Sequence, residues 1–126
     1  MPPSVSPTAT TIPSTPAHRA FLPLLESDDN GMVWVADTPA GDGYLVITWG
    51  WSIESGGRDA LLDEVYAEPR GAGIGSVLVE AALESLGESG VSRVFLETEE
   101  DNEAARRLYA RFGFAVEPSV WMSREL

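Results

Sequence analysis

The sequence predicts a single α/β domain in which one mixed β-sheet is flanked by helices. Apolar and polar residues alternate over 43–54, which is typical of a strand with one apolar face. In 73–87 and 102–112, apolar residues recur every three or four positions, which indicates two helices. With 126 residues, 44% of them apolar, the chain has the size and composition of one packed domain.

The N-terminal residues 1–16 are rich in proline, serine and threonine and are predicted to be a mostly disordered tail. Disorder is expected for 1–7, whereas Thr8–Ile12 can add a short edge strand because β-branched residues dominate there. The tail has neither a basic n-region nor an apolar h-region, so no secretory signal is predicted and a cytoplasmic location is expected. The domain itself is predicted to span 17–126, starting with a short helix over about Ala17–Glu26.

Three strands follow in the prediction, at Met32–Ala36, Gly43–Glu54 and about Ala60–Ala67. Gly56 and Gly57 predict a tight hairpin turn between the last two. The apolar face of the long second strand comprises Leu45, Ile47, Trp49, Trp51 and Ile53.

The C-terminal half is predicted to alternate between helix and strand. Its elements are a helix over about Gly73–Gly87, a strand over Val91–Thr98, a helix from a cap at Asp101 or Asn102 to about Phe112, and two short strands near Phe114–Val116 and Val120–Arg124. The resulting β-β-β-α-β-α-β-β order implies a mixed sheet with helices packed on it.

Composition excludes several kinds of site. The chain has no cysteine and one histidine, so we predict no disulfide, no thiolate or zinc site and no cysteine nucleophile. The formal net charge of −12 disfavours nucleic acid and anionic membranes as partners. It favours cationic small molecules or basic peptides, or it serves only to keep the protein soluble.

A glycine-rich loop is the strongest local signal for function. It lies between a predicted strand and a predicted helix and reads Arg70, Gly71, Ala72, Gly73, Ile74, Gly75, Ser76. The free amides of a helix N-terminus bind phosphate, and residues without a Cβ let the phosphate oxygens approach the backbone. The loop and its arginine therefore suggest a diphosphate ligand.

Other interpretations of this loop exist. A Walker P-loop is excluded because no Gly-Lys-Ser/Thr follows. A dinucleotide fingerprint fits the glycine spacing, with Glu97 at a suitable distance, but the preceding strand carries two acidic residues and only 29 residues follow Glu97. The glycines could also serve only a tight turn.

From about Gly43 onward the chain resembles the GNAT superfamily of N-acetyltransferases. The loop after Arg70 matches the family's R-x-x-G-x-G acetyl-CoA loop, and residues 102–109 match its N-x-x-A-x-x-L-Y motif. Residues 112–114 match the following G-F pair, and 63–67 look like the family's central strand. The resemblance implies a GNAT-like fold with a shortened N-terminus, and acetyl-CoA as co-substrate without a metal.

The resemblance also implies a mechanism, in which an amine attacks the thioester directly. Glu64 or its neighbour Asp63 would be the general base, with the family strand favouring Glu64, and a useful base is expected to be partly buried. Tyr109 would protonate the leaving thiolate and also contact the cofactor. Residues implied to bind acetyl-CoA are Val65, Tyr66, Ala67, Arg70, Gly71, Ala72, Gly73, Ile74, Gly75, Ser76, Asn102 and Tyr109.

The acceptor is expected to be a primary amine: a small amine, a polyamine or a lysine-like group. Because the N-terminal region is short for the family's acceptor site, a catalytically degenerate acetyl-CoA-binding module is the alternative. A small dinucleotide-binding oxidoreductase is the further alternative. Because the predicted terminal strands are exposed, formation of a homodimer stays an open alternative.

Overall fold

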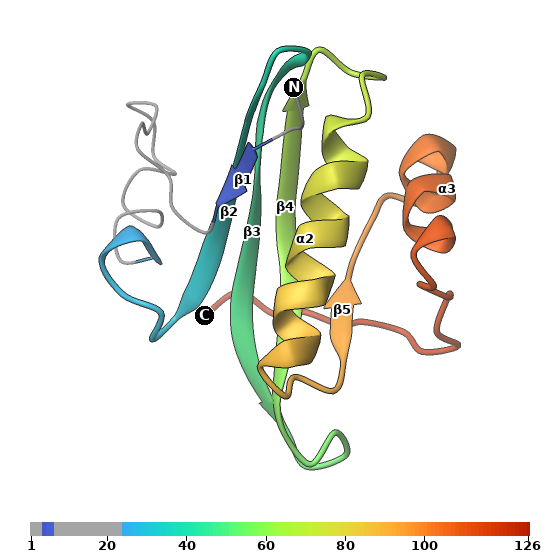
Figure 1. The fold of residues 1–126 in the computed structure, drawn as a ribbon. Helices are drawn as coiled ribbons and strands as arrows, with labels where there is room; N and C mark the ends of the chain where they lie inside the picture. Colours follow the sequence, from blue (N-terminus) through green and yellow to red (C-terminus); the bar gives the residue numbers. More distant parts are fainter. Residues whose placement is uncertain (1–3, 7–23) are drawn as a thin grey trace.

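In the computed structural model of this chain, residues 4–6 and 24–126 are described. Within these residues the strands form one five-stranded sheet in the order β1-β2-β3-β4-β5 (Figure 1). The elements are β1 (Ser4–Ser6), β2 (Gly31–Thr38), β3 (Gly41–Ser52), β4 (Gly57–Glu68), α2 (Ile74–Glu88), β5 (Val94–Leu96) and α3 (Glu103–Arg111). The first four strands are antiparallel to their neighbours and β5 is parallel to β4, so the predicted mixed α/β fold is confirmed.

The core lies between α2 and one face of the sheet. Alternation along β3 places Leu45 and Ile47 on this face, and both are fully buried. Leu78 and Leu86, two turns apart on α2, are buried against the same cluster. Burying one such side chain contributes about 1.5–3 kcal/mol, so this layer holds the helix, and the loop before it, in place.

The β3–β4 hairpin extends past the end of α2, as Figure 1 shows. Its turn covers residues 53–56, where the Gly56 amide donates to the Ile53 carbonyl at 3.2 Å. Trp51 and Ile53 are 79% and 95% exposed. The predicted apolar face is therefore not buried at this end, where Ile53 lies beyond β3 and no helix in the described part of the chain covers the hairpin.

Two helical predictions are confirmed within a residue or two. Helix α2 begins at Ile74, directly after Gly73, and α3 ends at Arg111. Of the two proposed caps for α3, the structure shows Asn102, whose side-chain Oδ1 accepts from the Ala105 amide at 3.1 Å. None of the helices in the described ranges is long and apolar enough to cross a membrane.

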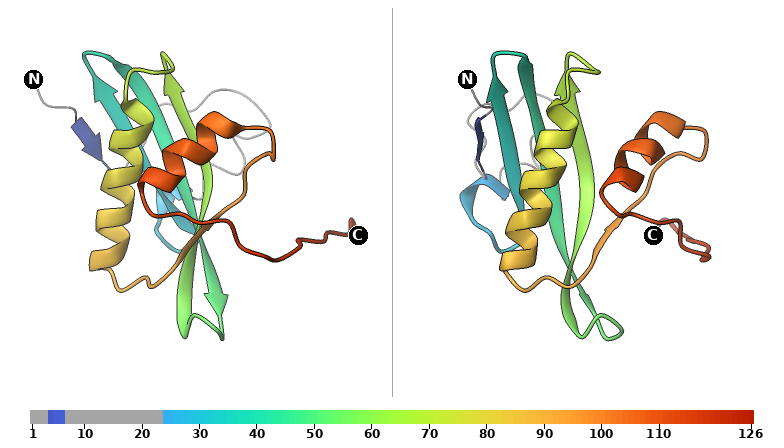
Figure 2. Two further views of the ribbon diagram at one scale, coloured as in Figure 1. Left: turned by 90° about the vertical axis from the view of Figure 1, so that its right-hand side faces the viewer. Right: turned by 45° about the vertical axis from the view of Figure 1, so that its right-hand side comes forward.

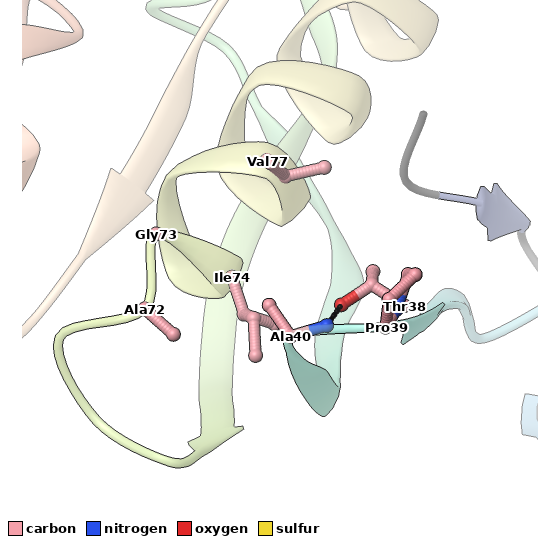
Figure 3. Close-up of a pocket in the computed structure, with 7 residues that line it drawn as sticks. All are labelled: Thr38, Pro39, Ala40, Ala72, Gly73, Ile74 and Val77. Atoms are coloured by element: carbon pink, nitrogen blue, oxygen red, sulfur yellow. Dashed lines mark hydrogen bonds between the residues drawn. The ribbon is translucent and has the colours of Figure 1, made fainter. Parts of the chain in front are cut away.

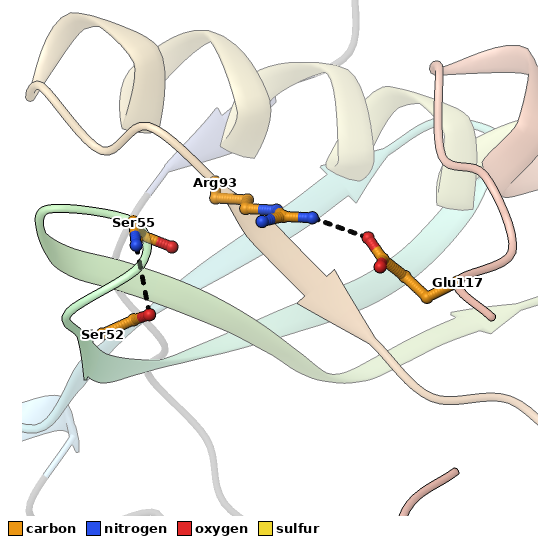
Figure 4. A network of polar contacts seen from close by, with 4 residues as sticks. All are labelled: Ser52, Ser55, Arg93 and Glu117. Carbon is orange, nitrogen blue, oxygen red and sulfur yellow. Dashed lines mark hydrogen bonds and ion pairs between the residues drawn. The ribbon is translucent and has the colours of Figure 1, made fainter. Parts of the chain in front are cut away.

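The chain after α3 differs from the prediction. Over 112–126 it forms neither helix nor strand, so the strands expected at Phe114–Val116 and Val120–Arg124 are absent from this described segment. An ion pair of 2.7 Å between Arg93 and Glu117 ties the segment beside the start of β5 (Figure 4). Pro118, which lacks an amide donor, follows at once, and the rest extends away from the body (Figure 2).

The N-terminal predictions have mixed outcomes. Ser4–Ser6 pairs with β2, so the expected disorder of 1–7 is corrected there. Thr8–Ile12 and most of the helix expected at Ala17–Glu26 lie outside the described residues, although residues 24–26 at its end are helical.

Candidate active site

The predicted glycine loop is exposed and leads directly into α2. Gly71 and Gly73 both have φ of 82°, a left-handed conformation that residues with a Cβ rarely adopt. A Cβ placed at either position would meet nothing within 4 Å. The glycines are therefore not packed into the interior, and the backbone between them faces open space.

The N-terminus of α2 has free hydrogen-bond donors. Gly73 caps the helix without a side-chain hydrogen bond, and the first turn contains no acidic residue. The first intrahelical bond runs from the Val77 amide to the Gly73 carbonyl, so the amides at 74–76 have no helical acceptor. These amides and the helix dipole together form an anion-binding surface.

Two arginines stand near this surface. Arg70 is exposed and forms no ion pair with the described residues. The hydrogen bond to Glu68 raises the pKa of the Tyr66 phenol, and the nearby Arg70 charge partly offsets this rise. Arg111, at the end of α3, donates from Nη2 to the Ser76 Oγ at 3.3 Å. Arg111 was not predicted from the sequence, where the only signal was a basic residue two positions after Tyr109.

A cavity of about 310 Å³ adjoins the loop on the side of the β2–β3 turn (Figure 3). Ala72, Gly73, Ile74 and Val77 line one wall, and Thr38, Pro39 and Ala40 line the other. The Thr38 hydroxyl is occupied by the turn itself, since it accepts from the Gly41 amide at 3.1 Å and donates to the Gly41 carbonyl at 2.7 Å. The cavity is therefore mainly apolar and borders the anion-binding amides.

Strands β4 and β5 separate beside the loop. Their parallel pairing is limited to Ala60–Leu62 with Val94–Leu96. After Leu96 the chain turns away toward α3, as Figures 1 and 2 both show. On this edge, the stretch 63–68 of β4 therefore has no strand partner among the described residues. Val65, Tyr66 and Ala67, predicted to bind the cofactor through their backbone, all lie in this unpaired stretch.

Helix α3 lies beside the first turn of α2. A Cβ on Gly75 would lie 3.7 Å from the Leu108 side chain, an ordinary contact distance, so the two helices are neighbours at this point. Tyr109, the next residue, packs half-buried against the core, with its ring 5.7 Å from that of Phe114. Burial raises the pKa of the Tyr109 phenol. Its hydroxyl has no hydrogen-bond partner among the described residues and stays protonated at neutral pH.

The two candidate bases lie where β4 is irregular. Val46 pairs with Glu64 and Ile47 with Leu62, so Asp63 is an extra residue in a β-bulge. Both carboxylates are exposed, which corrects the expectation that the base is partly buried. The bulge also interrupts the regular alternation of side chains along β4.

Glu64 has a defined partner and Asp63 has none among the described residues. The Tyr44 hydroxyl donates to the Glu64 Oε1 at 2.8 Å. Burial and then this hydrogen bond raise the pKa of Tyr44 to about 12. Tyr44 thus holds the Glu64 side chain. The only sequence signal for this contact is a tyrosine on the polar face of the predicted strand.

The structure gathers most predicted site residues around the start of α2: the loop 70–76, the unpaired stretch of β4, and Tyr109. Asn102 caps α3, and this capping is the contact that the structure shows for its side chain. The dinucleotide interpretation is wrong for this topology. It needs a strand before the loop that begins a doubly wound parallel sheet, whereas β4 is antiparallel to β3.

Comparisons with known proteins agree with this geometry. Residues 7–114 match the model of the acetyltransferase (GNAT) family. A mycothiol acetyltransferase of Corynebacterium aurimucosum is 34% identical over 113 residues, which cover 84% of this chain and 34% of that protein. The chain spans about a third of the length of the curated relatives that it matches.

Solved structures share the fold. An integron cassette protein from the mobile metagenome of Cole Harbour Salt Marsh has a TM-score of 0.75 and 29% identity, over 87% of this chain and 69% of that chain. An aminoglycoside acetyltransferase from an uncultured soil metagenomic sample has a TM-score of 0.72 and 22% identity, over 93% and 77% of the two chains. The second likeness concerns the fold alone. With the family match covering more than half of its length, the chain belongs to the GNAT family of acetyltransferases.

Proposed function

We propose that this protein transfers the acetyl group of acetyl-CoA to a primary amine by direct attack on the thioester. The observation that carries this proposal is the juxtaposition of an exposed glycine loop at the start of α2 with the unpaired stretch of β4. The loop offers donors for a diphosphate, and the strand edge offers donors and acceptors for an amide-rich arm.

In this proposal, the amides at 74–76 and the Arg70 guanidinium bind the diphosphate of coenzyme A. Arg111 adds a second positive charge through its position beside Ser76. The backbone of Val65–Ala67 pairs with the pantetheine arm and places the thioester carbonyl near the bulge. An amide of this stretch then stabilises the developing oxyanion.

The chemical step needs one base and one acid. An alkyl ammonium with a pKa of about 10.4 is almost wholly protonated at neutral pH, so Glu64 accepts a proton from it, directly or through water. The neutral nitrogen forms a bond to the thioester carbon and gives up its second proton to water, and the carbon–sulfur bond then breaks. Tyr109 donates its phenolic proton to the departing thiolate, whose conjugate thiol has a pKa of about 8.5. Tyr109 regains a proton from solvent.

Thiol release from acetyl-CoA, measured across a panel of amines, tests the proposal. Glu64→Gln should lower kcat by about 10²-fold, the lower end for general acid–base catalysis. Asp63→Asn, which changes the adjacent exposed carboxylate, is the matched control and should stay within a few-fold of wild type. A larger fall in kcat for Asp63→Asn than for Glu64→Gln would assign the base to Asp63.

Binding measured alongside separates catalysis from mere recognition. Acetyl-CoA at a hundredfold excess over its Kd should stabilise the fold by about 2.7 kcal/mol. Stabilisation without thiol release for any amine would contradict the transferase proposal and make the chain a binding module.

We also propose that the reaction takes place in the cytoplasm, as the sequence predicts.

A further inference from the structure

The sheet face turned away from α2 carries two tyrosines side by side. Tyr44 on β3 and Tyr66 on β4 are direct register partners. Their rings are stacked with centroids 5.5 Å apart and an angle of 26° between the planes. Tyr66 remains 46% exposed, so its ring offers an aromatic surface to solvent close to the bulge.

Each tyrosine hydroxyl donates to a carboxylate on the same face. Tyr44 binds Glu64 and Tyr66 binds the Glu68 Oε2, both at 2.8 Å. We call this set of four residues, Tyr44, Glu64, Tyr66 and Glu68, the tyrosine–glutamate ladder. It alternates aromatic rings and carboxylates along about 13 Å of strand, the length of four residues.

The negative charge of the ladder is not balanced within the described residues. A phenol that donates to a carboxylate orients it without cancelling its charge. Neither Glu64 nor Glu68 forms an ion pair there. Asp42 is the register partner of Glu68, and like charges directly opposite each other on a sheet are unfavourable. Among the described residues, Arg70 of the glycine loop is the cation whose charge acts on Tyr66.

The exposed ring of Tyr66 lies between two carboxylates that form no ion pair with the described residues, and this arrangement suits an organic cation with an apolar chain. An alkyl chain can lie along the rings while ammonium groups reach the carboxylates at either end. The two ends of the ladder differ in position, which sets the direction in which a chain with two ammonium groups would bind. Glu64 lies next to the bulge, and Glu68 lies four residues further along β4.

We infer that the acceptor is a diamine or longer oligoamine that binds along the ladder. This inference rests on the proposed function. The reacting amine lies at Glu64, where it loses its proton and attacks the thioester. The distal ammonium keeps its charge and binds Glu68, with the intervening methylene chain against Tyr66. A monoamine of the same length would lack the second contact.

The test compares butylamine, 1,4-diaminobutane and spermidine as acceptors. An exposed ion pair together with a cation–π contact predicts a kcat/KM about tenfold higher for the diamine or the triamine than for butylamine. Glu68→Gln should raise KM for the preferred oligoamine about threefold to fivefold, with kcat unchanged and no effect on butylamine. Glu88→Gln, an exposed acid at the far end of α2, should change nothing.

A pair of substitutions at Tyr66 isolates the ring. Tyr66→Phe keeps the aromatic face but removes the hydroxyl that orients Glu68, and it should raise the oligoamine KM less than Tyr66→Leu does. Tyr66→Leu should raise it about twofold to fivefold, the size of an exposed cation–π contact. Equal kcat/KM for the monoamine and the oligoamines, or equal effects of Glu68→Gln and Glu88→Gln, would overturn the inference.

Calorimetric titration of spermidine into the protein without acetyl-CoA separates this inference from the proposed function. If Glu68→Gln weakens spermidine binding but no thiol is released, the result would support oligoamine binding along the ladder and contradict the proposed transferase activity. If thiol is released equally with butylamine and with oligoamines, the result would support the transferase activity and contradict oligoamine binding along the ladder.

Discussion

The surroundings of the three tyrosines determine what each hydroxyl can do. Tyr44 and Tyr66 donate to carboxylates and are thereby occupied. Tyr109 is half-buried without such a partner in the described part of the chain, and burial raises the pKa of its phenol. It is therefore the tyrosine whose proton is both retained at neutral pH and available to a leaving group.

Tyr109→Phe tests that assignment. The variant keeps the ring that packs against Phe114 and loses only the proton. We expect kcat to fall by about 10²-fold, while the Kd for acetyl-CoA and the thermal midpoint stay near wild type. Steady-state thiol release and calorimetry measure the two quantities. An unchanged kcat would remove Tyr109 from the mechanism.

The raised pKa of Tyr44, caused first by burial and then by the hydrogen bond to Glu64, predicts a dependence of stability on alkaline pH. This pKa is about 12 in the folded protein, against 10.0 for an unperturbed tyrosine. The folded state therefore holds this proton more tightly, so the contribution to stability is full below about pH 10 and is lost as the pH rises toward about 12.

Tyr44→Phe removes this contribution. Between about pH 10 and pH 12, the free energy of unfolding should fall less steeply for the variant than for wild type. Urea denaturation at several pH values across that window measures both slopes. Parallel slopes would show that the pKa of Tyr44 is not raised in the folded protein.

Single residues also show where sequence reasoning reached its limit in the site. The glycine loop and Tyr109 were predicted because their motifs are local in the chain. The Tyr44–Glu64 contact spans 20 residues and Arg111–Ser76 spans 35. Both depend on strand register or helix packing, and neither is visible in the order of the residues.

At the level of elements, the site is the place where β4, α2 and α3 meet. Helix α2 starts directly after the loop. Leu108 and Arg111 of α3 lie beside the first turn of α2. The separation of β5 from β4 after Leu96 opens the edge beside them. The sequence predicted β5 over Val91–Thr98 because those residues favour strands. The observed β5 is shorter because the chain turns toward α3, which apolar periodicity does not encode.

The left-handed conformation at the helix start can be tested with two glycines of the same region. Gly73→Ala should cost about 1–2 kcal/mol of stability, since a Cβ strains φ of 82°. Gly87→Ala lies inside α2 with space around it and should stabilise by about 0.5–1 kcal/mol.

The same pair reports on cofactor binding. Gly73→Ala should weaken acetyl-CoA binding several-fold because the loop amides shift, whereas Gly87→Ala should leave the Kd unchanged. Urea denaturation and calorimetry provide the two readouts. Equal Kd values for both variants would argue against a role of the loop in binding.

On the scale of the whole molecule, the central elements followed from the sequence and the two ends did not. Strands β2 to β4 and helices α2 and α3 have strong periodic patterns that tertiary packing reinforces. Residues 114–124 contain β-branched and aromatic side chains, but a strand also needs an edge to pair with, and Pro118 interrupts the segment. Conversely, Ser4–Ser6 has little strand character and pairs because β2 offers an edge.

The distribution of charge also belongs to this scale. The net charge is −12, yet Arg70 and Arg111 both lie near the start of α2. Exposed carboxylates lie on the opposite face of the sheet, along the ladder. The molecule thus presents a local cationic surface to an anionic cofactor and an acidic surface to a cationic acceptor.

A crystal structure with bound coenzyme A tests the central claim most directly, through the distances from the backbone nitrogens of 72–76 to the diphosphate oxygens. We predict several of these at about 2.7–3.2 Å, with the pantetheine arm along 63–68 of β4. Coenzyme A bound elsewhere, with the glycine loop empty, would contradict the account.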